Sequence, residues 1–150
     1  FNQNNPTKKC IGIDNFSEFD FSEGNYPINL SPKKEFTNNF ENCKSENHFF
    51  YNMDYINYFN NEHKDKIGFY IYDGEHSYEN QLKGLQIAEP FFSDNCIILV
   101  DDTNEPQAKQ ATLDFIENSK NNYEIIFDKN TYCNAHPTFW NGIMIIRRKV

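Results

Sequence analysis

The fold is decided by residues 67–102, which contain two apolar segments that each stop on carboxylates. The first segment reads IGFYIY over 67–72 and is followed by DGEH over 73–76. The second reads CIILV over 96–100 and is followed by two aspartates. Short, continuously apolar runs rich in β-branched and aromatic residues are typical of strands buried on both faces of a parallel sheet. We therefore predict two parallel strands at these positions.

The segment between the two predicted strands has the periodicity of a helix. From Ser77 to Phe92, apolar residues recur at helical spacing, at Tyr78, Leu82, Leu85, Ala88 and Phe92. Such a strand–helix–strand unit makes a right-handed crossover, and both strands then end at one edge of the sheet. Open α/β sheets bind ligands at that edge. We therefore expect four side chains to meet there: Asp73, His76, Asp101 and Asp102.

The residues before this unit predict two further strands and two helices. Ser31 followed by Pro32 is typical of a helix start, because serine caps the first turn and proline suits the first helical position. Residues 15–30 contain glycine, proline and scattered aromatics, so we expect a loop long enough to act as a lid. The predicted elements are a strand at 10–13 that stops at Asp14, a helix from Ser31 to Lys44, a strand at 48–51, and a brief helix from Asp54 to Phe59.

The residues after Asp102 predict a helix and two antiparallel strands. The helix starts at Glu105 and Pro106 and presents an apolar stripe up to Ile116. Strands are predicted at 123–127 and 140–146, and no helix separates them, so they should pair antiparallel. The whole pattern predicts one α/β domain over residues 1–150. Its architecture should be a Rossmann-like three-layer α/β/α sandwich with a mostly parallel sheet and a terminal antiparallel strand.

Composition limits the classes of partner. The net charge of the 150 residues is −8, which argues against nucleic acid or an anionic membrane and favours a cation or a metal. The four cysteines are widely separated and form no C-x-x-C pair, so we expect them to be reduced and the protein to be cytoplasmic. No apolar run reaches the roughly 18 residues of a membrane span, and the first residues lack a signal-peptide core.

Two motifs resemble a known family. YDGEHSYE over 72–79, followed by ILVDDT over 98–103, is similar to class I S-adenosylmethionine-dependent methyltransferases. Within that class the motifs are most similar to the metal-dependent O-methyltransferases of the macrocin and cephalosporin-biosynthesis type, which act on sugars and other small hydroxylated molecules. The resemblance extends over residues 10–146. It implies transfer of a methyl group from S-adenosylmethionine to a hydroxyl of a sugar or another small molecule.

The resemblance also implies roles for the residues at the sheet edge. Asp73, Asp101 and Asp102 match the positions that ligate a divalent metal, and oxygen ligands with room for water and substrate suit Mg²⁺. A bound metal would lower the pKa of the acceptor hydroxyl. His76 matches the general base of sugar methyltransferases of this kind, and a neutral imidazole can take the hydroxyl proton.

Further positions match those that hold the cofactor. Asp14 matches the acid that binds the ribose hydroxyls, Asp54 matches a position near the adenine, and Asp73 is shared between cofactor and metal. Family members also open with a strand and a glycine-rich turn that cradle the methionine part of the cofactor, and neither precedes Cys10 here. The resemblance therefore implies a methyltransferase-like domain that is truncated at its N-terminus and lacks its first strand.

Simpler interpretations remain open for these residues. Asp73 and Asp101 can be strand-ending carboxylates that cap the following helices, and Asp102, His76 and Asp54 can be local caps. Asp14 can be a turn-former. His136 and Trp140 are interpreted as loop and core residues, with substrate contact as a minor alternative, and His48 and His63 as surface residues.

Other functions and states of assembly also remain open. A degenerate methyltransferase-fold domain that serves as an interaction module is the alternative to the enzyme, and a metal-dependent hydrolase is a third possibility. The acceptor, the metal and the oligomeric state, a homo-oligomer included, are not specified by the sequence.

Overall fold

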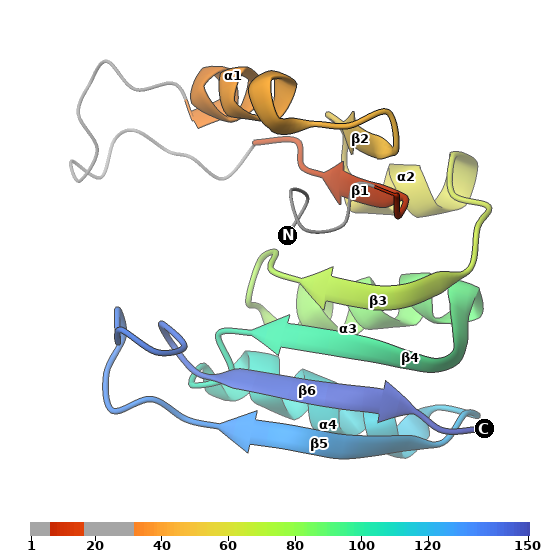
Figure 1. Cartoon of the computed structure of the whole chain (residues 1–150). Helices are drawn as coiled ribbons and strands as arrows, with labels where there is room; N and C mark the ends of the chain where they lie inside the picture. Colours follow the sequence, from red (N-terminus) through yellow and green to blue (C-terminus); the bar gives the residue numbers. More distant parts are fainter. Residues whose placement is uncertain (1–6, 17–31) are drawn as a thin grey trace. The chain divides into compact units, whose positions relative to one another are not determined.

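The computed structural model describes residues 7–16 and 32–150 (Figure 1). These belong to two compact units, Phe1–Glu62 and His63–Val150, and each unit is described by itself. The loop predicted over 15–30 and the predicted helix cap Ser31 fall almost entirely outside the described residues. Within the described ranges, no helix is both long enough and apolar enough to cross a membrane.

The first unit is a strand–helix–strand arrangement followed by a short helix. Strand β1 (Cys10–Ile13) pairs in parallel with β2 (His48–Tyr51), with Cys10 opposite His48 and Ile13 opposite Tyr51. Helix α1 (Pro32–Cys43) connects them, and α2 (Tyr55–Asn61) follows β2. The predicted strands at 10–13 and 48–51 are confirmed, and the brief helix runs two residues further than predicted.

Aromatic rings pack the first unit. The Phe36 ring lies 4.6 Å from that of Phe50 and 5.7 Å from that of Phe40. Tilted and offset rings at these distances add stabilisation beyond the burial of their area. The prediction that His48 is a surface residue is wrong, because only 4% of it is exposed and its Nδ1 accepts a hydrogen bond from the Ser45 N–H at 3.0 Å. Burial of an imidazole is stable when such a partner is present.

The second unit is a four-stranded mixed sheet. Its strands stand in the order β3 (Ile67–Tyr72), β4 (Phe92–Asp101), β6 (Ile143–Arg148) and β5 (Tyr123–Lys129). β3 is parallel to β4, and β6 is antiparallel to both of its neighbours. Helices α3 (Tyr78–Ala88) and α4 (Pro106–Asn118) lie on the same face of this sheet (Figure 1). The predicted strand–helix–strand unit and the antiparallel strand are both confirmed.

The boundaries of several elements differ from the prediction. Helix α3 ends at Ala88, because Pro90 lacks the N–H that would continue it, and a short 3₁₀ turn η3 (Glu89–Phe91) follows. Phe92, predicted on the helix, is instead the first residue of β4 and is completely buried. The last strand begins at Ile143 rather than at Trp140. Trp140 and Gly142 have φ of +48° and +86°, which is incompatible with extended backbone.

The core of the second unit lies between the sheet and the two helices. One side chain of β3 shows how closely α3 approaches: a Cβ on Gly84 would lie 2.0 Å from Cε2 of Tyr72. Only glycine allows this contact, so Gly84 brings α3 against the strand that carries the site. The fully buried apolar side chains include Cys96, Ile98, Val100, Met144 and Ile146 from the sheet and Leu85, Ala88, Ala108 and Ala111 from the helices.

Candidate functional site

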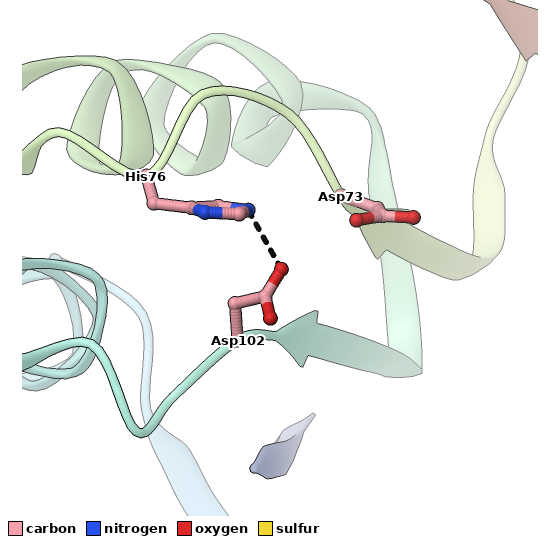
Figure 2. A group of neighbouring side chains, drawn as sticks. All are labelled: Asp73, His76 and Asp102. Carbon is pink, nitrogen blue, oxygen red and sulfur yellow. Dashed lines mark ion pairs between the residues drawn. The ribbon is translucent and has the colours of Figure 1, made fainter. Parts of the chain in front are cut away.

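The carboxyl ends of β3 and β4 meet at one edge of the sheet. Tyr72 stands opposite Val100 in the parallel register, so the residues that follow both strands leave the sheet side by side. One ligand atom from each of Asp73, His76 and Asp102 lies within 4.8 Å of the others. Figure 2 shows the His76 ring and the Asp73 carboxylate on either side of the Asp102 carboxylate. The predicted meeting of these three side chains is confirmed.

An ion pair joins two members of this group. Nε2 of His76 lies 2.8 Å from Oδ2 of Asp102, and the two side chains are 39% and 13% exposed, respectively. Asp73 is exposed. The group is therefore accessible from solvent while its central carboxylate is largely shielded, which is the arrangement expected of a site that admits a ligand.

The backbone at Asp102 determines which of the two consecutive aspartates joins the group. Asp102 has φ of +53°, a left-handed conformation that aspartate tolerates better than most residues. Its N–H donates to Oδ1 of Asp101 at 3.0 Å, and its carbonyl accepts from the N–H of Glu105 at 2.9 Å. Asp101 thus holds the turn, and among the described residues the group of three includes Asp102 but not Asp101. The ligand role of Asp101 stays a prediction.

The turn that carries His76 is fixed at both ends. At its start, the Tyr72 hydroxyl donates to the carbonyl of Glu75 at 3.3 Å. At its end, Ser77 is the N-cap of α3, and its hydroxyl accepts from the backbone N–H of Asn80 at 3.4 Å. The Asn80 amide also donates to Oε2 of Glu75 at 2.5 Å. These bonds restrict the turn and so hold the position of the imidazole.

A second set of contacts ties α3 to α4 immediately after His76. The Tyr78 hydroxyl donates to Oδ2 of Asp114 at 2.7 Å, and the Tyr78 N–H donates to Oε1 of Gln107 at 3.1 Å. The hydrogen bond lowers the pKa of the Asp114 carboxyl and raises the pKa of Tyr78. The sequence predicts Tyr78 in an apolar stripe and in the motif over 72–79, but no local pattern links it to Gln107 or Asp114, which lie far along the chain.

The simpler interpretation of the group as helix caps does not hold. The N-cap of α3 is Ser77 and that of α4 is Glu105, so neither His76 nor Asp102 occupies a cap position. Asp73 and Asp101 likewise lie before the caps. The alternative that these residues are the N-caps of the following helices is therefore wrong.

Two of the three aspartates predicted at the cofactor, Asp14 and Asp54, lie in the first unit. Asp54 is the N-cap of α2, and its Oδ1 accepts from the N–H groups of Ile56 at 2.9 Å and Asn57 at 3.2 Å, so the capping interpretation is confirmed. Asp14 directly follows β1, and its Oδ1 accepts from the Phe16 N–H at 2.6 Å. Asp14 is thus a turn-former. The cofactor roles of both residues stay predictions.

The donor atoms of the group fit a divalent cation. Two carboxylates and one imidazole within 4.8 Å of one another can occupy part of a coordination sphere and leave room for water or substrate oxygens. Carboxylate oxygens suit Mg²⁺ and Mn²⁺, and an imidazole shifts the preference toward transition metals. The same imidazole, if it is not a ligand, is placed to accept a proton from a bound hydroxyl.

Similar solved structures share this fold. A Corynebacterium glutamicum protein superposes with a TM-score of 0.60 at 10% identity, over 93% of this chain and 60% of its own. A candidate S-adenosylmethionine-dependent methyltransferase from Streptococcus mutans gives 0.59 at 13% identity, over 95% of this chain and 46% of its own. The O-methyltransferase from Bacillus cereus in complex with S-adenosylhomocysteine gives 0.60 at 12% identity, over 99% and 77%.

These comparisons establish the fold. The chain has the Rossmann-like α/β fold of S-adenosylmethionine-dependent methyltransferases, as the strand order and the resemblance predict. It spans 60% and 46% of the length of the first two of these proteins. No family model matches the sequence, and no curated protein matches it. Activity therefore has to be argued from the site, because a fold can carry many functions.

Proposed function

We propose that the protein is a cytoplasmic O-methyltransferase that uses S-adenosylmethionine and a divalent cation to methylate a hydroxyl of a sugar or another small molecule. The observation that carries this proposal is the grouping of Asp73, His76 and Asp102 at the C-terminal edge of two parallel strands. Open α/β sheets bind their ligands at this edge. The fold shared with a Bacillus cereus O-methyltransferase in complex with S-adenosylhomocysteine supports the choice of cofactor.

In this proposal Asp73 and Asp102 hold the cation, and Asp101 is the third carboxylate predicted from the sequence. When bound, the cation would supply charge that lowers the pKa of the acceptor hydroxyl. His76 takes the hydroxyl proton on its imidazole. Asp102 has two carboxylate oxygens, so the oxygen 2.8 Å from His76 can orient the ring while the other faces the cation. Asp102 is thus both a ligand and a positioning residue.

The cofactor is proposed to bind through Asp14 at the ribose hydroxyls and Asp54 near the adenine, and Asp73 is proposed to serve both cofactor and metal. β1 ends at Ile13, the residue before Asp14, and β2 ends at Tyr51, shortly before Asp54. The residues proposed at the ribose and at the adenine therefore both follow the C-terminal end of a strand. In the described residues β1 and β3 belong to different sheets.

The lack of pairing between β1 and β3 in the described residues favours a second candidate function. A methyltransferase-fold domain without the strand that cradles the methionine part of the cofactor could act as an interaction module rather than an enzyme. In that case the carboxylates at the sheet edge would bind neither cofactor nor acceptor. Cofactor affinity therefore discriminates between the two functions.

Isothermal titration of the full-length protein with S-adenosylhomocysteine tests the proposal. We expect one saturable site, weakened in Asp14→Asn and unchanged in Asp94→Asn, an exposed carboxylate at the start of β4. Methyl transfer from labelled S-adenosylmethionine to a panel of hydroxylated small molecules should then depend on added Mg²⁺ or Mn²⁺. Absence of any binding at millimolar S-adenosylhomocysteine would overturn the enzyme and leave the interaction module.

A further inference from the structure

The loop between β5 and β6, residues 130–142, leaves the sheet at the same edge as the candidate site. β4 and β5 are both antiparallel to β6, so β4 and β5 end at the same edge. The loop re-enters the sheet at Ile143, which pairs directly with Asp101. The end of this loop is therefore one strand away from the carboxylates.

Asn104 fastens both ends of the loop to the turn that follows Asp102. Its amide donates to the carbonyl of Thr131 at 3.1 Å and to Oγ1 of the same residue at 2.9 Å, and its Oδ1 accepts from the Thr131 N–H at 3.1 Å. Its backbone N–H donates to the carbonyl of Asn141 at 2.9 Å. A Cβ on Gly142 would lie 2.6 Å from Oδ1 of Asn104, so this close approach requires glycine.

The rest of the loop is also held by its own hydrogen bonds. His136 and Trp140 exchange backbone hydrogen bonds of 2.9 and 3.1 Å, and the Gly142 N–H donates to the carbonyl of Phe139 at 3.0 Å. The Phe139 ring packs against Phe127 of β5 with centroids 5.5 Å apart. The loop is thus fixed to the sheet and to the site turn.

Trp140 is exposed in this fixed loop. The prediction that it is a core residue is wrong, because 61% of it is exposed. Its φ of +48° is unfavourable for a bulky side chain, so the loop holds its backbone in a strained conformation. Burial does not explain why the chain's single tryptophan is presented in this way. Strain that packing does not require is characteristic of positions that bind ligands.

We propose that Trp140 is a stacking platform for the ring of the methyl acceptor, which makes a hydroxylated ring, rather than an acyclic alcohol, the substrate class. This inference rests on the proposed function. The indole offers a wide apolar face and little conformational entropy to lose, and such faces stack on aromatic rings or on the C–H face of a sugar. A ring held at this loop can direct a hydroxyl toward the edge that carries Asp102 and His76.

Fluorescence tests the proposal directly, because all indole emission comes from Trp140. The full-length protein, with S-adenosylhomocysteine and Mn²⁺ present, is titrated with phenyl β-D-glucopyranoside, which carries a saturated and an aromatic ring. Sorbitol, an acyclic polyol, is the control. A saturable change with the glucoside alone supports the platform. No saturable change, or an equal change with sorbitol, overturns it.

Variants provide a second measurement by calorimetry with the same glucoside. Trp140→Ala should weaken binding about tenfold, while Trp140→Phe should stay within about threefold of wild type, because a phenyl ring retains part of the stacking. Tyr132→Ala removes an aromatic side chain that is 97% exposed in the same loop and should change nothing. Wild-type affinity in Trp140→Ala overturns the platform. S-adenosylhomocysteine binding is measured on the same samples, so failure of the proposed function is seen separately.

Discussion

The two ends of the sheet in the second unit carry carboxylates with opposite environments. At the end where β4 begins, Oε1 of Glu89 accepts hydrogen bonds from Asn121 at 2.9 Å, from the Tyr123 hydroxyl at 2.9 Å, and from the Ser119 hydroxyl. At the end where β4 stops, the Asp102 carboxylate contacts the imidazole of His76, a group that can exchange its proton.

This difference separates a carboxylate that stabilises the fold from one that we propose takes part in the reaction. Three neutral donors bond to Oε1 of Glu89 and so link η3, the end of α4 and β5 at the end of the sheet where β4 begins. Burial and the bond to Glu89 also raise the pKa of Tyr123, so this hydroxyl stays a donor. Asp102 instead contacts a titratable partner and stands near an exposed Asp73. Replacing residues at one end should therefore change stability, and at the other end catalysis.

The largest effect is expected for His76→Ala, at the end of the sheet where β4 stops. If the proposed function is right, turnover of the full-length protein should fall by about 10²–10⁴-fold, the range for loss of a general base, while cofactor affinity stays close to wild type. The thermal midpoint should change little, because the imidazole is 39% exposed. Steady-state kinetics and calorimetry on the same preparation measure the three quantities. Wild-type turnover in this variant at every pH around neutrality would mean that His76 is not the base.

A smaller effect, on stability rather than on turnover, is expected for Glu89→Ala at the end of the sheet where β4 begins. Removing the acceptor leaves the half-buried Tyr123 hydroxyl and the Asn121 amide without their partner, which should lower the free energy of unfolding by about 1–3 kcal/mol. Turnover well below the melting temperature should not change. Glu117→Ala, at an exposed carboxylate of α4, is the matched control. Loss of turnover without loss of stability would invalidate the distinction between the two ends.

The smallest effect is expected for Tyr78→Phe, which removes the hydroxyl bonded to Asp114. The bond lowers the pKa of Asp114 in the folded state, so its stabilisation is present above the unfolded carboxyl pKa of about 4 and is lost as the pH falls through the lower folded value. It also raises the pKa of Tyr78, so the stabilisation declines again when the pH rises above about 10. The free energy of unfolding, measured with urea, should therefore differ most between variant and wild type at pH values between these limits. If the difference in unfolding free energy between variant and wild type is the same at pH 3 as near neutrality, the bond to Asp114 is not its cause.

Much of the second unit could be predicted from its apolar pattern. The apolar runs at 67–72 and 96–100 predict parallel strands with a crossover helix, and with them the meeting of Asp73, His76 and Asp102. The predicted burial of both faces is wrong for β3, because Phe69 and Ile71 are exposed. The end of α3 was mispredicted although its cause is local. Phe92 continues the helical spacing, but Pro90 prevents the helical hydrogen bond.

The finer geometry of the site depends on information that no local pattern contains. Which of two consecutive aspartates turns toward His76 depends on φ of +53° at Asp102, and this backbone angle is set by bonds to Asp101 and Glu105. The Tyr78 and Asp114 contact joins two helices. The exposure of Trp140 depends on a loop anchored by Asn104 from another turn. Such tertiary contacts can be found only once the elements are placed.

Electron paramagnetic resonance measures the binding of Mn²⁺ to the full-length protein. It tests whether the group of Asp73, His76 and Asp102 is a metal-assisted reaction site. The account predicts one ion per chain, bound at least about tenfold more weakly in Asp102→Asn and as in wild type in Asp94→Asn. Asp101→Asn in the same series tests the third carboxylate predicted from the sequence. Equal affinity in wild type and Asp102→Asn would contradict the account, because the residue at the centre of the group would then hold no metal.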